Sequence, residues 1–343
     1  MLDNIKSIDS NNFFKSIKDF PKQIEEVFQS KNTILKNKDS LEHSYENILF
    51  CGMGGSAIAG DLLKSMLVED MKIPIVINRD YSVPNWLSKS TLVILSSYSG
   101  NTEEVLSCYS ECINRGNKPI IISSNGKLLK NAKKIGDSYA LIPKGLMPRA
   151  ALGYSISILF KILNEITIIN FHQISKLKKT IVSLKKDSVL YSKIDSNNKA
   201  ILLAKEIHNS FNLIYTSNNM EVIGMRFRAQ LAENAKMLSS HFVFPEQNHN
   251  EIEGFINTFV NKLNILWVYD QDSHNKILKR MEITSSILQG KVKKHIIKSE
   301  GETFIERELR LIYFLDWVSF YCAIFNNVNP YPVDSISKLK SLL

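Results

Sequence analysis

Short apolar runs alternate with longer stretches of helical spacing along most of the chain. The runs at 91–95 and 119–123 are built on consecutive Leu, Val and Ile, and small polar residues follow each of them. Strands that are apolar on both sides are buried on both faces, as in parallel sheets covered by helices. The pattern therefore predicts an α/β fold in which strands and helices alternate.

The first half carries a full set of these runs. Strands are expected at 47–51, 73–77, 91–95, 119–123 and 139–142. Helices are expected at 56–67, from about 102 onwards, and from just after Pro148-Arg149 to 163. The segment before them, up to about Glu46, has apolar residues at helical spacing, and Pro21 is expected to break it into two helices.

The second half repeats the alternation after a helical connector at about 170–195. Its expected strands are 212–216, 264–269 and 292–297, and its expected helices are 222–238, 272–289 and 302–326. No residue-level repeat is visible, so a duplicated fold follows from the alternation alone. We predict two domains, each a parallel sheet flanked by helices in three layers. The boundaries are an N-terminal domain at 1–165, a connector at 166–195, a C-terminal domain at 196–328 and a tail at 329–343.

The composition is that of an ordinary globular protein. The 343 residues suit two domains of about 150 residues each. Apolar residues make up 44%, and no run approaches the roughly 20 apolar residues that a membrane span needs. The opening residues 1–6 lack the basic-then-apolar pattern of a signal peptide. We expect a cytoplasmic protein without a membrane partner.

The formal net charge of +9 raises the possibility of nucleic-acid binding. However, the clearest basic run, at 176–186, falls on the expected connector helix and has no interleaved aromatic residues. A solvated helix face explains it, so no nucleic-acid partner is expected. A positive balance also suits an enzyme whose substrate is a phosphate dianion.

The cysteines are Cys51, Cys108, Cys112 and Cys322, and none forms a C-x-x-C pair. No His or Cys cluster beside them completes a zinc site, so we expect no metal. Buried thiols in a reducing compartment are the expected state.

Two loops that follow predicted strands carry candidate chemistry. The first, at 52–57, fits G-x-G-x-x-A, a weak dinucleotide fingerprint, and Asp80 lies where a ribose-binding acid could be. A nicotinamide-dependent dehydrogenase therefore has to be weighed. The same glycines could instead bring backbone N–H groups close to a simpler anion.

The second loop, at 96–104, favours a phosphate monoester. Short hydroxyl side chains lie at Ser97, Ser99 and Thr102, before an expected helix whose dipole favours negative charge. Asn101 with Glu104 fits a capping box. The loop has no Walker lysine, so a nucleoside triphosphate is not expected.

These loops, with further segments in the same order, resemble one family. The matching segments are 52–61, 97–104, 148–155, 233–236 and 248–252, with a weaker match at 332–340. They are similar to the bifunctional phosphoglucose/phosphomannose isomerase family, whose members are built from two sugar-isomerase (SIS) domains. The resemblance implies an aldose–ketose isomerase that acts on a sugar 6-phosphate through an enediol, without a cofactor.

The resemblance also implies roles for individual residues. They are Glu233 as the base, His249 and Lys340 in ring opening, Arg149 for enediolate charge, Ser97, Ser99 and Thr102 at the phosphate, and Gly55 and Ser56 at the substrate. It further implies that the tail returns to the active site. A homodimer is expected, in which His249 enters the partner subunit's active site.

Two questions stay open at this point. The family's C-terminal segment commonly reads Pro-Thr-Pro-Val, with the Thr associated with the mannose epimer, whereas this chain has Tyr331 between Pro330 and Pro332. Acceptance of mannose 6-phosphate is therefore in question. The alternative function is a non-catalytic SIS-domain sensor of sugar phosphates, which would need neither Glu233 nor His249.

Overall fold

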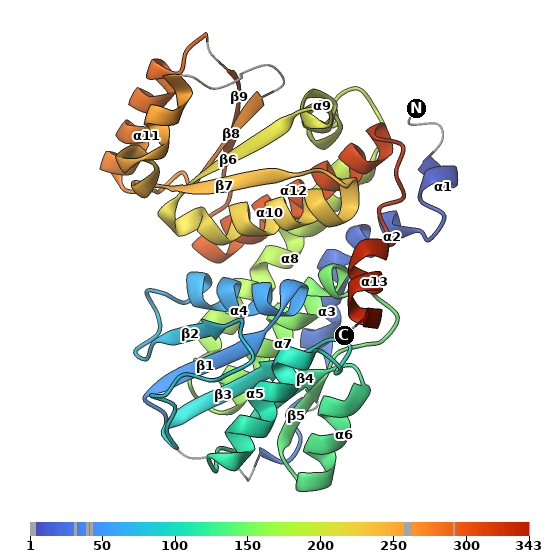
Figure 1. Ribbon diagram of the computed structural model, residues 1–343, viewed down its shortest axis with the longest axis vertical. Coiled ribbons are helices and arrows are strands. Elements are labelled where there is room, and N and C mark those ends of the chain that lie inside the picture. The colour runs from blue at the N-terminus through green and yellow to red at the C-terminus, as the bar shows by residue number, and fades with distance from the viewer. Residues whose placement is uncertain are drawn as a thin grey trace. The chain divides into compact units, whose positions relative to one another are not determined.

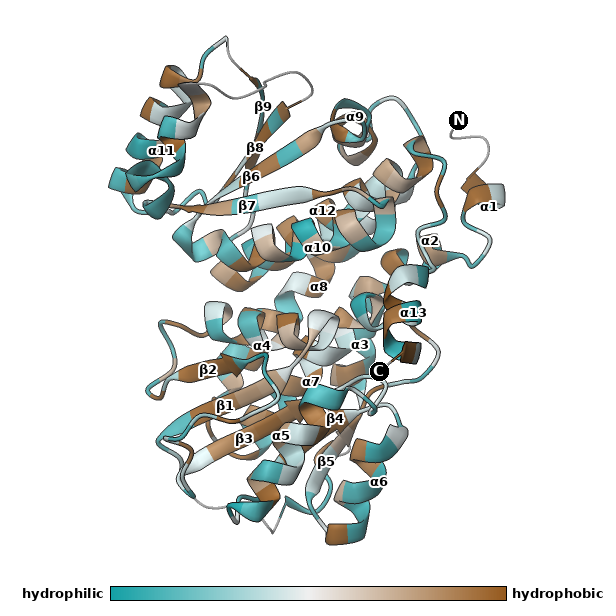
Figure 2. Ribbon diagram, in the orientation of Figure 1, coloured by the Kyte–Doolittle hydropathy of each residue, from teal (hydrophilic) through white to brown (hydrophobic). Residues whose placement is uncertain are grey.

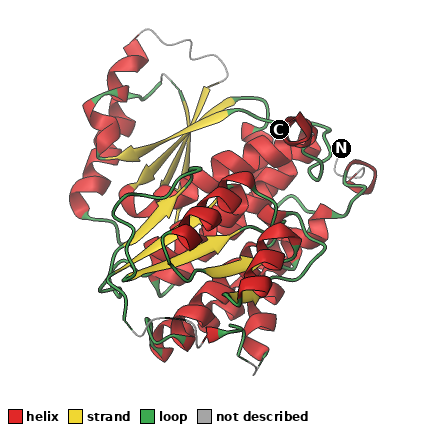
Figure 3. Ribbon diagram, turned by 60° about the horizontal axis from the view of Figure 1, so that its bottom comes forward, coloured by secondary structure: helices red, strands yellow, loops and turns green. Residues whose placement is uncertain are grey.

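The computed structural model describes residues 5–30, 33–38, 41, 44–256, 263–290 and 292–342. The opening residues 1–6, from which a signal peptide is not expected, lie partly outside the described residues. By packing, the chain divides into a first-sheet unit of residues 20–181 and a second-sheet unit of residues 1–19 with 182–343. Each unit contains its own sheet, with strands enclosed by helices (Figures 1 and 3).

The first sheet has the order β2-β1-β3-β4-β5, and all its strand pairs are parallel. Its strands are β1 (Asn47–Gly52), β2 (Ile75–Asn78), β3 (Thr91–Ser96), β4 (Ile120–Ser123) and β5 (Ser138–Leu141). The helices of this unit are α3 (Phe20–Gln29), α4 (Gly54–Met66), α5 (Glu103–Asn114), α6 (Gly126–Ile135) and α7 (Leu152–Glu165). On one face, Leu49, Val93 and Ile121 form a core with α5 and α6. On the other, α4 lies against β1 and packs on α7.

The second sheet has the order β7-β6-β8-β9 and is also parallel throughout. Its strands are β6 (Phe211–Ser217), β7 (Ser239–Phe244), β8 (Leu263–Tyr269) and β9 (Lys293–Lys298). The helices of this unit are α1 (Ile5–Ile8), α2 (Phe13–Lys18), α9 (Lys199–Ile207), α10 (Glu221–Ala235), α11 (Asn275–Ile287), α12 (Phe304–Phe325) and α13 (Asp334–Leu342). Tyr215, Ile265 and Trp267 pack with α11 on one face, while α10 and α12 pack together on the other. The remaining helix, α8 (Phe171–Ser192), begins in the first-sheet unit and ends in the second.

The two sheets repeat one topology, which confirms the predicted α/β class with parallel sheets between helices. The order β7-β6-β8-β9 matches β2-β1-β3-β4, and α10, α11 and α12 correspond to α4, α5 and α7. Among the described residues, the second half has no counterpart of α6 and β5, and its chain passes from β9 directly to α12. Hydropathy follows this design: β1 and β3 are largely hydrophobic, whereas α6 and α11 carry hydrophilic stretches (Figure 2).

Several predicted boundaries were wrong. The leading helices end at Gln29 rather than near Glu46, and Lys36 instead forms an antiparallel bridge to Tyr139. Pro21 does mark a break, since α2 ends at Lys18 and α3 begins at Phe20. The structure adds α6, α9 and β7, which the sequence patterns did not indicate.

Residues 5–19 belong to the second-sheet unit, where the ring of Phe14 lies edge-on to Trp317 and Phe320. The predicted domain boundaries remain predictions, because a division by packing does not test where each domain folds alone. None of the described helices combines the length and the apolarity that crossing a membrane requires.

Candidate active site

The carboxyl ends of β1, β3 and β4 bring three loops to one edge of the first sheet. Gly52 pairs with Ser96, and Ser96 pairs with Ile122, so these strands end in register. The backbone N–H of Tyr98 donates to Ser56 Oγ at 3.3 Å. The loop at 52–57 (the glycine loop) and the loop at 96–104 (the serine loop), which were predicted separately, therefore contact each other.

The serine loop is compact and partly closed by its own hydroxyls. Ser97 is 1% exposed, its Oγ lies 2.8 Å from Thr102 Oγ1, and it accepts the N–H of Gly100 at 3.1 Å. Ser99 is exposed and accepts the N–H of Asn101. The three predicted phosphate-binding hydroxyls thus lie in one turn at the start of α5, where the helix dipole favours an anion.

The predicted capping box was wrong. Thr102, not Asn101, is the N-cap of α5, and no side chain at that cap accepts a helix N–H within the described structure. Asn101 Oδ1 accepts the N–H of Lys127 at 3.0 Å instead. The asparagine therefore joins the serine loop to the first turn of α6, which begins just past the loop after β4.

Gly100 is required where these two loops meet. Its φ of +67° is in the left-handed region, and a Cβ there would lie 1.8 Å from the carbonyl oxygen of Asn125. A side chain at this position would therefore push the two loops apart.

Gly100→Ala is expected to raise KM for a sugar phosphate at least tenfold and to lower the thermal midpoint, because the serine loop must shift. Gly136→Ala is the matched control: its φ is +90°, but no atom of the described residues lies within 4 Å of the added Cβ. Both variants carry the cost of positive φ, on the order of 1 kcal/mol. Equal KM values for the two variants would show that the loop contact is unimportant for binding.

Tyr98 was not singled out from the sequence, yet it organises this edge. Its hydroxyl donates to the Pro143 carbonyl and accepts the N–H of Leu146, each at 2.9 Å. It thereby holds the segment that leads to Arg149. In the sequence, the only indication of this role was a large aromatic residue between two serines, Ser97 and Ser99.

Arg149 lies beside the glycine loop. It is 3% exposed, in the short 3-10 helix Pro148–Ala150. A Cβ on Gly55 would lie 2.9 Å from the backbone nitrogen of Arg149, so only glycine allows this approach. The first-sheet unit thus brings together Gly55, Ser56, the serine loop and Arg149.

Glu233 lies near the C-terminal end of α10 in the second-sheet unit and is half-buried. One side of α10 is fixed to α12 by buried bonds. Arg226 and Gln230 donate to Asp316, and Asn234 donates to Ser319 Oγ at 2.9 Å. The helix that carries the candidate base is therefore held rigidly.

The end of α10 also holds the C-terminal segment. Lys236, in the left-handed conformation, donates through Nζ to the backbone oxygens of Glu233 and Pro332. Tyr331, beside Pro332, lies edge-on to Phe13 with ring centroids 6.3 Å apart. Tyr331, which departs from the family pattern, is thus the residue before Pro332, and Pro332 contacts the C-terminal end of α10, the helix that carries Glu233. Lys340 is exposed on α13.

His249 ends the 3-10 turn Glu246–His249 and is exposed. Its neighbours are anchored. Asn248 Nδ2 donates to Thr284 Oγ1 on α11 at 2.8 Å, and Tyr215 on β6 donates to Glu251 Oε1 at 2.8 Å. Burial raises the pKa of Glu251 to about 7.

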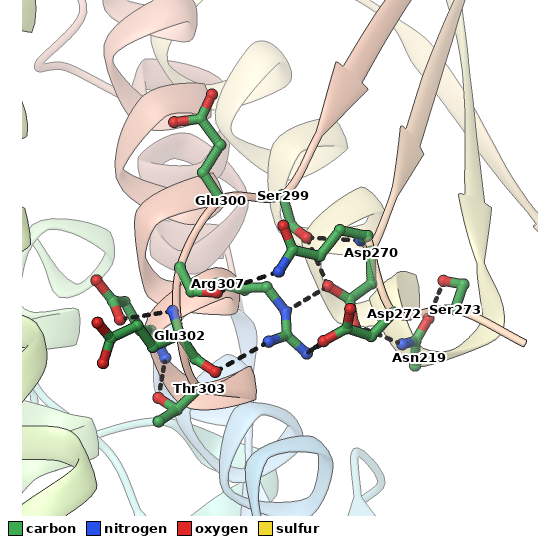
Figure 4. Close-up of polar contacts among 12 residues, drawn as sticks. Asn219, Asp270, Asp272, Ser273, Ser299, Glu300, Glu302, Thr303 and Arg307 are labelled. Carbon is green, nitrogen blue, oxygen red and sulfur yellow. Dashed lines mark hydrogen bonds and ion pairs between the residues drawn. The ribbon is translucent and has the colours of Figure 1, made fainter.

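The corresponding edge of the second sheet is built differently (Figure 4). Asp270, directly after β8, accepts two bonds from Arg307 of α12, at 2.6 and 3.1 Å. Ser299 and Asn219 also donate to Asp270. This edge holds an internal carboxylate, whereas the first edge presents hydroxyls. Within the described residues, no group of three or more His, Cys, Asp or Glu side chains is placed to hold a metal ion.

Comparisons with known proteins agree with this architecture. Residues 196–343 match the family described as "Bacterial phospho-glucose isomerase C-terminal SIS domain". A bifunctional phosphoglucose/phosphomannose isomerase from Caldicellulosiruptor bescii is 36% identical over 96% of this chain and 98% of its own length. This chain belongs to the bifunctional phosphoglucose/phosphomannose isomerase family.

Other relatives are consistent with that membership. The Aquifex aeolicus bifunctional phosphoglucose/phosphomannose isomerase is 34% identical over 87% of this chain and 91% of its own length. A solved structure, the C-terminal domain of glucosamine-fructose-6-phosphate aminotransferase from Francisella tularensis, covers 93% of this chain and 97% of its own, with a TM-score of 0.71 and 14% identity. That likeness supports the fold of two SIS-type domains.

Proposed function

We propose that this chain interconverts glucose 6-phosphate and fructose 6-phosphate by moving a proton between C1 and C2 through an enediol. The observation that carries the proposal is the 36% identity to a bifunctional isomerase over nearly both full lengths. The hydroxyl-lined turn at the start of α5 supports it, because such a turn suits a compact phosphate monoester.

The proposed roles follow the chemistry of the reaction. Ser97, Ser99 and Thr102 hold the phosphate, with Gly55 and Ser56 beside the sugar. Arg149 stabilises the negative charge that develops on the enediolate oxygen. Glu233 takes the proton from one carbon and returns it to the next, while His249 and Lys340 assist ring opening. One carbon is oxidised as its neighbour is reduced, so no external electron acceptor is needed.

We further propose a homodimer in which His249 acts in the partner subunit's site, which its exposure permits. Sedimentation velocity of the purified chain tests the assembly. A cytoplasmic location is proposed because all four cysteines are buried and free, as suits a reducing compartment.

A coupled assay on glucose 6-phosphate and mannose 6-phosphate, run side by side with EDTA present, tests the function. Turnover of glucose 6-phosphate is expected. Weaker turnover of mannose 6-phosphate is expected, because Tyr331 places a large ring where the family commonly has a small hydroxyl. Stabilisation of the protein by both sugars without turnover of either would favour the sensor instead.

A further inference from the structure

The turn that carries His249 is tied to the second-sheet unit on both sides of an exposed imidazole. Asn248, one residue before it, is bonded to Thr284 on α11. Glu251, two residues after it, is bonded to Tyr215 on β6. Asn250 adds local bonds, donating to Glu246 and accepting the N–H of Glu251. Surface loops are usually more mobile than the elements they connect, so these two anchors hold the turn more firmly than is usual.

The Glu251 anchor reaches into the aromatic core of the unit. Tyr215 is fully buried, and its ring lies edge-on to Trp267 and Phe244, with centroids 5.2 and 5.9 Å away. The second carboxyl oxygen of Glu251 is buried and has no hydrogen-bond partner among the described residues. The raised pKa of about 7 reflects the same burial.

This arrangement is unfavourable as simple packing. A carboxyl group held by one hydrogen bond in an apolar setting costs free energy that an apolar side chain would not. What the bond achieves is a fixed position for the segment 249–251, because Tyr215 cannot move within its ring cluster.

We propose that Glu251 is a positioning residue for His249: its bond to Tyr215 fixes the turn so that the imidazole is presented at one place. The inference rests on the proposed function, in which His249 assists ring opening. Acid–base groups lose efficiency steeply when displaced, and a shift of about 1 Å can lower a rate on the order of a hundredfold. Glu251 itself acts only through His249.

A double-mutant cycle tests the coupling. Glu251→Ala and Tyr215→Phe are each expected to lower kcat by about tenfold to a hundredfold, with KM for glucose 6-phosphate within about twofold of wild type. Glu251→Gln, which can still accept the tyrosine hydroxyl, is expected to retain most activity. Glu253→Ala is the matched control, since Glu253 is an exposed acid two residues further on.

The combined variant is decisive. Glu251→Ala is expected to cause no further loss in a His249→Ala background, because the residue to be positioned is gone. Multiplication of the two losses would overturn the proposal and leave Glu251 with a general structural role. Full activity of His249→Ala would overturn it too, by removing His249 from the mechanism.

Hydrogen–deuterium exchange separates this inference from the proposed function. The 244–256 segment is expected to exchange faster in Glu251→Ala and Tyr215→Phe, but not in Glu251→Gln or Glu253→Ala. Unchanged exchange in the first two variants would overturn the anchor, whatever the activity. If wild type does not isomerise glucose 6-phosphate, the proposed function fails and the positioning role fails with it, although faster exchange would still establish the anchor.

Discussion

Glu233→Gln is expected to lower kcat for glucose 6-phosphate by about a thousandfold while KM changes little. General acid–base groups contribute on the order of a hundredfold to ten-thousandfold, and an amide cannot accept the substrate proton at neutral pH. The phosphate-binding hydroxyls are untouched by the change, so binding should persist. A coupled assay over a range of substrate concentrations separates the two constants.

The fold should survive this substitution. Lys236 bonds to the backbone oxygen of Glu233, which the substitution leaves in place, and α10 is fixed through Arg226, Gln230 and Asn234. Glu221→Gln, at the exposed start of the same helix, is the matched control and should leave kcat unchanged. A near-wild-type kcat in Glu233→Gln would exclude Glu233 as the base.

Asp270→Ala is expected to destabilise the second-sheet unit by about 3–5 kcal/mol. Arg307 is 5% exposed, and removal of Asp270 leaves its buried guanidinium with the exposed Asp272, 3.0 Å away, and the Glu302 carbonyl, at 3.4 Å, as partners. Ser299 and Asn219 lose their acceptor as well. Urea unfolding followed by circular dichroism measures the change.

Glu282→Ala is the control for this stability prediction, because its ion pair with Lys279 is exposed on both sides and such pairs contribute little. The double variant Asp270→Leu with Arg307→Met should recover much of the loss, since apolar replacements can substitute for a buried ion pair. A small effect of Asp270→Ala alone would mean that Asp272 or water compensates Arg307 fully.

The strands and their parallel pairing could be predicted because buried strands need continuous apolar residues, as at 91–95 and 119–123. The missed elements lack that signal. Helix α6 is rich in lysine and buries only Leu128, Leu129 and Ala132, so its sequence looks like a polar loop. Strand β7 is half-buried along most of its length, as an edge strand can be.

The candidate site, too, contains features that the sequence could predict and features that it could not. Residues within one loop, such as Ser97 and Thr102, could be grouped from their spacing. The bond from Tyr215 to Glu251 spans 36 residues and that from Asn101 to Lys127 spans 26, so no local pattern could indicate them. The Asp270–Arg307 pair was missed for the same reason.

The absence of a β5 counterpart has a consequence for the chain's behaviour in solution. Within the described residues, β9 is an edge strand of the second sheet. The backbone N–H and C=O groups along its outer edge can pair with a strand of another molecule. Three of its six residues are lysines: Lys293, Lys294 and Lys298. Like charges oppose edge-to-edge pairing of two molecules, and salt weakens that repulsion. Resistance to aggregation should therefore be greatest at low ionic strength. It depends on the lysines of β9, in the second-sheet unit.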